Sequence, residues 1–346
     1  FEFTLMAGKN YKGIKGIEIE DARFCELEYL KFTIFSHEFF YLKGALKLIK
    51  KESPDAIFCS GVDFHLIHTI FIYFYHFIFK RKPFIWWSHA GSGKQGKFGS
   101  LLRGILYKYS SGAAVYSEKG KNNLIKWGVK KDSIAIIKNA INEKDYGFLK
   151  YDLTHYKKHH NELSILFCGR ITGDKKLEVL IRSINIIKSK YFIPIKLVIV
   201  GGGDIINLKN MINELGIHKN IEFSGAKYED DLLKYYMDSD LFVYPGGIGL
   251  SIVQALSYGL PVITSDNIEL HGPEIELLKK GSNGDFFKDG CPISLASKII
   301  EWKDKISNSN KNEIMLNCID SVKESGYLPQ NVSKLLIHFL EKNCNR

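Results

Sequence analysis

Cysteine is scarce and scattered in this sequence of 346 residues. The six cysteines show neither CxxC nor histidine-flanked spacing; they are Cys25, Cys59, Cys168, Cys291, Cys318 and Cys344. This spacing excludes both a disulfide framework and a zinc-binding framework. We therefore expect reduced thiols, most of them buried, in a cytosolic protein.

Long apolar runs are also lacking. The best candidate for a membrane span, residues 65–79, has 15 residues including three histidines, whereas a span needs about 20. Because it lies between two strand-like runs, we interpret it as a buried crossover helix. Internal repeats and low-complexity segments are absent too, and the length and apolar content fit a globular protein of two domains.

Acidic residues are almost missing from residues 80–131, which hold twelve Lys and Arg but one acid, Glu118. This block accounts for the net charge of +10, and apolar and aromatic side chains such as Trp86, Trp87 and Tyr109 are interleaved with it. Such a surface suits anionic phospholipids or a lipid-diphosphate acceptor. The alternative is a solvated basic face that only aids solubility. Nucleic acid fits less well, since no recognition helix, RNP motif or zinc finger accompanies the charge.

Strand-like and helix-like segments alternate along the chain. Strands are expected at residues 56–60, 84–88, 112–116, 134–138, 163–168, 195–200, 221–223, 241–244 and from 262. Helices are expected at residues 64–79, 99–109, 118–127, 177–188, 205–215, 229–237, after 249 and at 330–341. This alternation predicts an α/β fold with doubly wound parallel sheets.

The alternation is interrupted once, at residues 143–162, where Tyr, Lys, His and Asn replace the periodic pattern. We predict an N-terminal Rossmann-like domain over residues 1–145, a linker over 146–162 and a second Rossmann-like domain over 163–322. Residues 323–346 would form a helix packing back towards the first domain. Two such domains would face a cleft in which strand ends place ligands. Residues 1–6 already alternate like a strand, so we expect an earlier strand of the first domain to be missing from this sequence.

Glycine-rich turns follow several strands of the second half, above all in residues 244–264. Free backbone N–H groups at such a turn suit phosphate. Arg170 offers a planar fork and Lys175 a point charge, a good pair for a diphosphate leaving group. The residues expected to bind a nucleotide donor are Gly169, Gly201, Gly203, Gly225, Tyr228, Gly246, Gly247, Ile248, Gly249, Leu250, Ser251 and Gln254.

Five short motifs follow one another along the chain in a specific order and spacing. They are Gly-Arg-x4-Lys from Gly169, Val-Gly-x-Gly from Val200, Phe-x-Gly from Phe223, Asp-Leu-Phe-Val-x-Pro from Asp240 and Gly-Leu-x3-Gln-Ala-x3-Gly-x-Pro-Val-Ile from Gly249. Their order and spacing resemble family-4 glycosyltransferases, which are GT-B enzymes that transfer a sugar with retention from a nucleotide donor. The resemblance covers residues 163–290 well. It is looser in the first half, where residues 84–90 look like the family's strand ending in a histidine, here His89.

The resemblance implies a mechanism. The acceptor hydroxyl would attack on the leaving-group side, and Arg170 and Lys175 would stabilise the departing diphosphate, so that no metal and no cofactor is required. His89 would contact the donor sugar or the acceptor; the alternative is a core or capping histidine. Asp238 and Asp240 look like a metal motif, but they lie at a helix-to-strand junction, where a structural role is favoured.

Two positions depart from the family pattern. Its two donor-site glutamates, eight residues apart, fall on Gly246 and Gln254. Gln254 still offers an amide to ribose hydroxyls, whereas Gly246 has no side chain. The Pro-Gly-x-x-Gly-Leu form resembles a subgroup among bacterial capsule, O-antigen and lipopolysaccharide glycosyltransferases, which leaves the donor sugar open.

We therefore expect a cytoplasmic hexosyltransferase, peripheral on the inner face of the cell membrane. It would use a nucleoside-diphosphate sugar and a lipid-linked or polysaccharide acceptor in cell-envelope polysaccharide synthesis. The main alternative is a catalytically degenerate GT-B scaffold subunit of a polysaccharide assembly complex. A sugar-nucleotide epimerase is a weaker alternative, because the acids that it needs have no clear place in the sequence.

Overall fold

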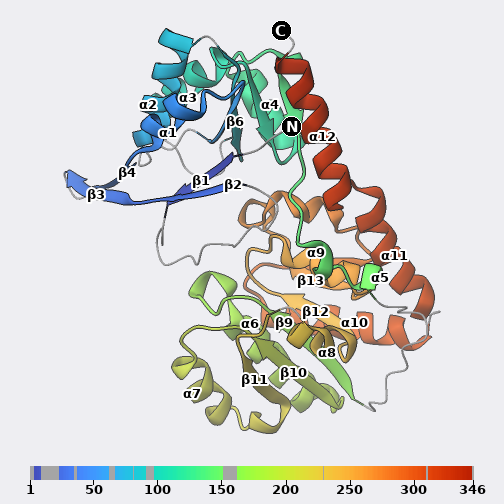
Figure 1. Ribbon diagram of the computed structural model, residues 1–346. Coiled ribbons are helices and arrows are strands. Elements are labelled where there is room, and N and C mark those ends of the chain that lie inside the picture. The colour runs from blue at the N-terminus through green and yellow to red at the C-terminus, as the bar shows by residue number, and fades with distance from the viewer. Residues whose placement is uncertain are drawn as a thin grey trace. The chain divides into compact units, whose positions relative to one another are not determined.

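A computed structural model describes residues 4–8, 23–34, 37–61, 67–80, 82–90, 97–150, 162–228, 230–308 and 311–344. The chain forms two compact units, Phe1–Lys138 with Lys334–Arg346, and Asn139–Ser333 (Figure 1). Residues 139–150 thus belong to the second unit. Most of the predicted linker, residues 151–161, lies outside the described residues.

The first unit is built on a four-stranded parallel sheet of order β5-β6-β7-β8. Its strands are β5 (Ile57–Ser60), β6 (Phe84–Ser88), β7 (Gly112–Val115) and β8 (Ile134–Ile136). Two strand pairs precede it: parallel β1 (Thr4–Gly8) with β2 (Arg23–Leu27), and antiparallel β3 (Tyr29–Ile34) with β4 (His37–Leu42). The sequence predicts the four parallel strands but not this hairpin. Few of its side chains are buried, Phe40 and Leu42 among them, so it lacks a clear alternation of inside and outside residues.

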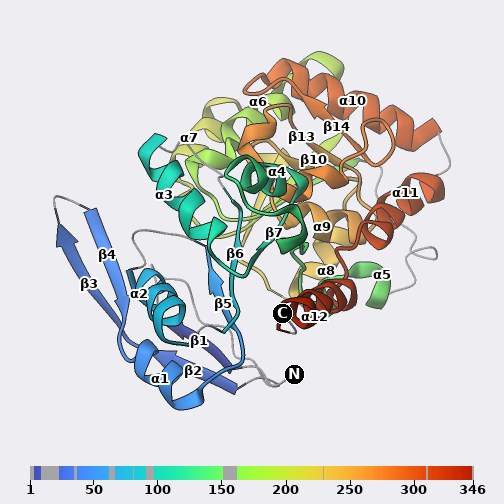
Figure 2. The same ribbon diagram turned by 90° about the horizontal axis from the view of Figure 1, so that it is seen from above.

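Helices α2 and α3 cover the sheet of the first unit on the side of Trp86 (Figure 2). The helices of this unit are α1 (Ala45–Glu52), α2 (Ile67–Tyr75) with a π-helical continuation His76–Lys80, α3 (Lys97–Lys108) and α4 (Glu118–Lys126), and a 3-10 turn spans Lys131–Ser133. Trp86 is fully buried, with the ring of Tyr73 stacked 5.6 Å away. Its Nε1–H donates to the Leu106 carbonyl at 3.4 Å. This one side chain therefore holds α2 and α3 against the same face.

The second unit has a six-stranded parallel sheet of order β11-β10-β9-β12-β13-β14. The strands are β9 (Leu163–Cys168), β10 (Ile195–Val200), β11 (Ile221–Gly225), β12 (Leu241–Tyr244), β13 (Val262–Ser265) and β14 (Gly284–Phe287). The chain starts in the middle, moves outward through β10 and β11, and returns to begin β12 on the other side of β9. This is the doubly wound order, whose direction reverses between β9 and β12, where such sheets bind ligands.

The helices of the second unit lie on both faces of its sheet (Figure 1). The α-helices are α5 (Gly147–Lys150), α6 (Leu177–Ile186), α7 (Ile206–Glu214), α8 (Asp230–Met237), α9 (Ser251–Ser257), α10 (Pro292–Asn308) and α11 (Lys311–Glu324). A π-helical turn covers Ile187–Tyr191, and 3-10 turns cover Glu143–Asp145, Gly173–Lys175, His218–Asn220, Ile268–Leu270 and Pro273–Leu277. Helix α6 packs against α10, and α9 packs against α11.

Several local predictions are confirmed. Ser117 caps α4 by accepting from the N–H of Gly120, and Gly128 follows that helix with φ of +84°. The last helix, α12 (Pro329–Cys344), begins in the second unit and ends in the first.

The prediction that most cysteines are buried needs correction. Of the five cysteines whose side chains are described, all free, Cys59 and Cys318 are buried and the other three are only half-buried. Within the described ranges, no helix combines the length and apolarity that a membrane span requires.

Candidate functional site

The two turns that follow β9 and β12 come together at the reversal point of the second sheet. Gly169 follows β9, and a Cβ atom there would lie 2.8 Å from the hydroxyl of Tyr244, the last residue of β12. Tyr244 is buried, and its ring stacks 4.8 Å from that of Phe167. Burial raises the pKa of Tyr244 to about 12, so it stays a neutral phenol. Gly169 is therefore required by the close approach of this ring.

Gly246 and Gly247 are enclosed by backbone from two other segments. A Cβ atom on Gly246 would overlap the carbonyl oxygen of Asp174 and lie 2.6 Å from Cα of Lys175. A Cβ atom on Gly247 would overlap the carbonyl oxygen of Leu270. The position where the resembled family has a glutamate thus has no room for a side chain in this protein. The space is taken by the 3-10 turn Gly173–Lys175.

Lys175 ties the β9 turn to the β12 turn. Its Nζ donates to the Gly247 carbonyl at 3.1 Å and lies 2.8 Å from Oδ2 of Asp174. The same ammonium lies 5.6 Å from the ring centroid of Tyr244. The Lys175 side chain is 19% exposed and that of Asp174 is 65% exposed. The hydrogen bond from Lys175 lowers the pKa of Asp174. The sequence predicts Lys175 as a point charge for a diphosphate, and the structure adds that this charge is paired with the neighbouring Asp174.

Arg170 is the exposed cation of this edge. It is near enough to Tyr244 that its charge acts to lower the pKa of the phenol, against the larger effect of burial. The prediction that Arg170 and Lys175 lie together at the end of β9 is consistent with this placement.

The turn from Ile248 to Ser251 offers three backbone donors. Among the described residues, no hydrogen bond uses the N–H of Gly249, Leu250 or Ser251 as donor. The N–H of Ile248, by contrast, donates to Nδ1 of His271 at 3.1 Å and is therefore not available to a ligand. The predicted role of Ile248 in donor binding stays a prediction. Helix α9, which starts here, has only seven residues, so its dipole is modest.

His271 fixes this turn, and sequence reasoning missed it. Its Nε2 lies 2.8 Å from the Ser265 carbonyl, which can only accept, so Nε2 carries the proton and Nδ1 accepts from Ile248. Burial lowers the pKa of His271, which favours this neutral form. Its position six residues after β13 was the available signal, because it follows a strand at the ligand-binding edge.

Gln254 lies on α9, and its side chain is positioned by a hydrogen bond from a buried tyrosine. The hydroxyl of Tyr236 donates to Oε1 of Gln254 at 3.1 Å, and Tyr236 is only 1% exposed. Tyr236 also hydrogen-bonds the half-buried Cys168. The side-chain oxygen Oε1 of Gln254 is thus engaged, which leaves the side-chain NH₂ group to face a ligand.

The other predicted glycines have structural explanations. A Cβ atom on Gly201 would lie 2.9 Å from the carbonyl carbon of Gly169, and one on Gly203 would lie 2.7 Å from Cβ of Ile171. Both serve the bridge that pairs residues 169–171 with the end of β10. Gly225 has φ of +71° and accepts from the N–H of Gly201. Tyr228, three residues on, is 74% exposed. Their roles towards a ligand remain predictions.

His89 belongs to the first unit and follows β6 directly. Its ring lies 4.6 Å from that of Tyr116, which follows β7. His89 is exposed, but the protein atoms around its ring partly desolvate it, and this desolvation lowers its pKa. The next residue, Ala90, has a left-handed φ of +46°, held by a bond from its N–H to Ser88 Oγ at 2.9 Å and by one from Asn123 to its carbonyl at 3.2 Å. A strained residue that is held so firmly is typical of functional sites.

Asp240 has a structural role, as the sequence favours. Its Oδ2 accepts from the N–H of Ser164 at 3.0 Å and so ties the start of β12 to β9. Within the described residues no group of three or more His, Cys, Asp or Glu is arranged to hold a metal ion.

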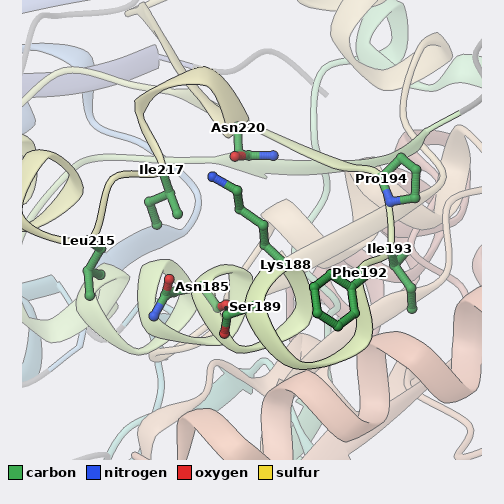
Figure 3. A pocket seen from close by; sticks show the side chains of 9 residues that line it. All are labelled: Asn185, Lys188, Ser189, Phe192, Ile193, Pro194, Leu215, Ile217 and Asn220. Atoms are coloured by element: carbon green, nitrogen blue, oxygen red, sulfur yellow. Dashed lines mark hydrogen bonds between the residues drawn. The ribbon is translucent and has the colours of Figure 1, made fainter.

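A pocket of about 510 Å³ lies at the other end of the second sheet (Figure 3). Its lining residues come from the end of α6, the start of β10 and the turns around α7 and β11; they are Asn185, Lys188, Ser189, Phe192, Ile193, Pro194, Leu215, Ile217 and Asn220. It is at the amino ends of the strands and so is separate from the turns described above. Lys188 within it donates to the Gly216 carbonyl at 3.1 Å.

Comparisons with known proteins agree with this arrangement. Residues 153–314 match the family model described as "Glycosyl transferases group 1". An uncharacterized glycosyltransferase of Methanocaldococcus jannaschii is 29% identical over 199 residues, which cover 53% of this chain and 50% of the relative. The capsular polysaccharide biosynthesis glycosyltransferase CapM of Staphylococcus aureus is 27% identical over 209 residues, covering 58% of this chain and 54% of CapM. The chain thus spans about half the length of these curated relatives.

Among solved structures, Anabaena HepE in complex with UDP superposes with a TM-score of 0.66 at 18% identity, covering 86% of this chain and 81% of HepE. This likeness shows the fold. Over residues 153–314 the chain is therefore similar to glycosyl transferases group 1, and its two parallel α/β units have the GT-B fold.

Proposed function

We propose that this protein is a retaining glycosyltransferase of family-4 type. It would move a hexose-type sugar from a nucleoside diphosphate to a lipid-linked or polysaccharide acceptor in cell-envelope polysaccharide synthesis. The observation that carries the proposal is the junction at the β9–β12 reversal point, where Lys175 joins the two glycine turns beside the exposed Arg170. The similarity to a capsular polysaccharide glycosyltransferase supports the process. The UDP bound to a protein of the same fold supports a nucleotide donor.

In this proposal the leaving diphosphate lies against the β9 and β12 turns. Arg170 approaches it from solvent with a planar pair of donors. Lys175 is already oriented by its hydrogen bond to the Gly247 carbonyl. Its ammonium leaves the ion pair with Asp174 and binds a phosphate oxygen instead. The free N–H groups of Gly249 and Leu250 add donors that need no rearrangement. Fixed donors of this kind stabilise charge on a leaving group as it develops, so we propose transfer without a metal ion.

Substitution of the two cations tests the proposal. We expect Arg170→Ala and Lys175→Ala each to lower kcat by about 10²–10³-fold, the usual effect of removing one charge-stabilising donor. Lys190→Ala is the matched control, since its ammonium lies over the ring of Tyr191 at the other end of the same unit. Turnover is followed with UDP-, GDP- and ADP-sugars. Failure of every sugar nucleotide to bind or turn over would refute the function.

A second candidate is a catalytically inactive scaffold with the same fold. The absence of a side chain at position 246, enforced by the Gly173–Lys175 turn, favours it. A scaffold predicts that Lys175→Ala leaves complex formation with polysaccharide-assembly proteins unchanged while the wild-type protein shows no transfer. Measurable wild-type transfer that depends on Lys175 would exclude it.

We also propose that the basic region 80–131 attracts the protein to an anionic membrane, which would place it on the inner face of the cell membrane. The twelve Lys and Arg of this region support the proposal, because juxtaposed cations bind anionic lipid headgroups. Binding by charge alone should fall steeply as salt rises.

A further inference from the structure

Helices α2 and α3 expose apolar side chains on their outer faces. The exposed residues of α2 and its π-helical continuation are Phe71, Phe74, Phe77 and Ile78, at 54, 47, 58 and 59%. Those on α3 and just after it are Leu101, Leu102, Ile105 and Tyr109, at 64, 39, 45 and 59%. We call these eight residues the outer apolar face. The sequence predicts that α2 is a buried crossover helix, and the structure corrects this: only its inner face is buried.

The two helices present this face on one side of the first unit. Their inner residues Tyr73 and Leu106 both contact Trp86 on β6, and both views show α2 and α3 on the same side of that strand (Figures 1 and 2). Spacing within each helix agrees with this, since Phe71, Phe74 and Ile78 lie three and four residues apart. The outer residues therefore form a surface of two neighbouring helices.

Lysines lie beside tyrosine rings at the C-terminal ends of α2 and α3, where Tyr109 itself belongs to the outer apolar face. The Lys108 ammonium lies 5.8 Å from the ring centroid of Tyr109 at the end of α3. Lys50 of α1 lies 5.2 Å from the ring centroid of Tyr75 at the end of α2. Between residues 67 and 131 the sequence has one acid, Glu118. Apolar faces bordered by Lys and Tyr are typical of surfaces that lie in the headgroup region of a bilayer.

We propose that the outer apolar face enters the hydrocarbon boundary of an anionic bilayer, with α2 and α3 lying along the membrane plane. The proposal extends the charge attraction proposed above for residues 80–131, and it does not depend on sugar transfer. Charge brings the protein to the surface, and insertion of Phe and Leu side chains then holds it there. The chemistry favours lipid over a protein partner, because a protein surface would have to supply acids against a border of lysines and an apolar centre at once.

Vesicle binding of the full chain tests the insertion step. Neutral phosphatidylcholine vesicles and vesicles with added phosphatidylserine are compared at 0.1 M and 1 M salt, chosen because charge attraction is screened within roughly 3 Å at about 1 M. We expect part of the binding to survive high salt. Phe74→Ser and Leu101→Ser should each lower the partition coefficient about tenfold or more, the effect of losing one buried large apolar side chain.

Phe192→Ser is the matched control, since Phe192 is 83% exposed but lies in the second unit. It should bind vesicles like the wild type. Thermal unfolding of each variant verifies that it is folded. Because Phe74 and Leu101 lie on different helices, the other variant still tests insertion if one of them does not fold. Binding that vanishes completely in 1 M salt would leave the charge proposal standing and overturn insertion. Absence of any vesicle binding would overturn both. Equal losses in Phe192→Ser, or a dimer that Leu101→Ser dissociates without vesicle binding, would also overturn insertion.

Discussion

The two units share a parallel α/β design but differ in what they expose. In the second unit the exposed large apolar residues are spread over several elements, for example Phe192, Ile206 and Ile293. Its candidate ligand-binding groups instead lie at one end of the sheet, around Lys175 and the turn after β12. In the first unit the exposed apolar residues are concentrated on α2 and α3. The two units therefore differ in the surfaces for which we propose functions: nucleotide binding in the second unit and bilayer insertion in the first.

The largest effect in testing this difference is expected from Gly246→Glu, which restores the glutamate of the resembled family. Because a Cβ atom there overlaps the Asp174 carbonyl, the Gly173–Lys175 turn must move. We expect a loss of about 1–3 kcal/mol in the free energy of unfolding, as for other overpacked sites, together with loss of nucleotide binding. Both are measured, by denaturant titration and by calorimetry.

Gly173→Ala is the control for this change, since a Cβ atom at Gly173 meets nothing within 4 Å. It should stay within about 0.5 kcal/mol of the wild type. Vesicle binding by Gly246→Glu should be unchanged if the two surfaces are independent. A gain of activity in Gly246→Glu would show that the glutamate can be accommodated and that the turn is not fixed as described.

A smaller effect is expected from Tyr236→Phe, which removes the hydroxyl that donates to Gln254. Loss of one buried hydrogen bond should cost about 1 kcal/mol of folding free energy, visible as a lower Tm. Because the amide of Gln254 is then free to turn, we also expect weaker nucleotide binding, seen as a higher KM with little change in kcat. Tyr235→Phe is the control, since its hydroxyl has no hydrogen-bond partner among the described residues. Equal KM values for both variants would contradict a positioning role for Tyr236.

The smallest effect concerns pH. Burial lowers the pKa of His271 below its ordinary value of 6.5, so the unfolded chain binds more protons than the folded one as the pH falls. The stability contributed by neutral His271 is complete above about pH 6.5 and is lost as the pH falls through the lower folded-state pKa. Protonation also removes the acceptor of the Ile248 N–H. Nucleotide affinity should therefore weaken on acidification, and His271→Asn should flatten that part of the titration profile. If the pH dependence of nucleotide affinity is the same in His271→Asn as in the wild type, another group titrates, and His89 is the next candidate.

Local sequence signals were enough for most of the fold. The period of apolar residues predicts nine of the ten strands in the two larger parallel sheets, all except β14. Ser117 and Gly128 mark the ends of α4 as the structure has them. The period of apolar residues does not predict the β3–β4 hairpin, because so few of its side chains are buried. The outer face of α2 was misjudged for a related reason: a helix that is apolar all round has the same sequence whether one face or both are buried.

In the candidate site, too, some features could be predicted from the sequence and others could not. Gly169, Arg170 and Lys175 follow β9 and match a motif, and Gln254 lies on the helix after the β12 turn. Their positions in the chain were therefore enough to predict that they lie at the ends of neighbouring strands. The contacts that these residues make follow instead from the folded structure. It paired Lys175 with Asp174 and Gly247, filled the space at Gly246 with the Gly173–Lys175 turn, and brought His271 and Tyr236 beneath the turns. The positions of strands and helix caps follow from residues close together in the chain, whereas hydrogen bonds and steric exclusion between distant segments exist only once the sheet has formed. The Tyr236–Gln254 and Lys175–Gly247 hydrogen bonds, for example, join residues 18 and 72 positions apart.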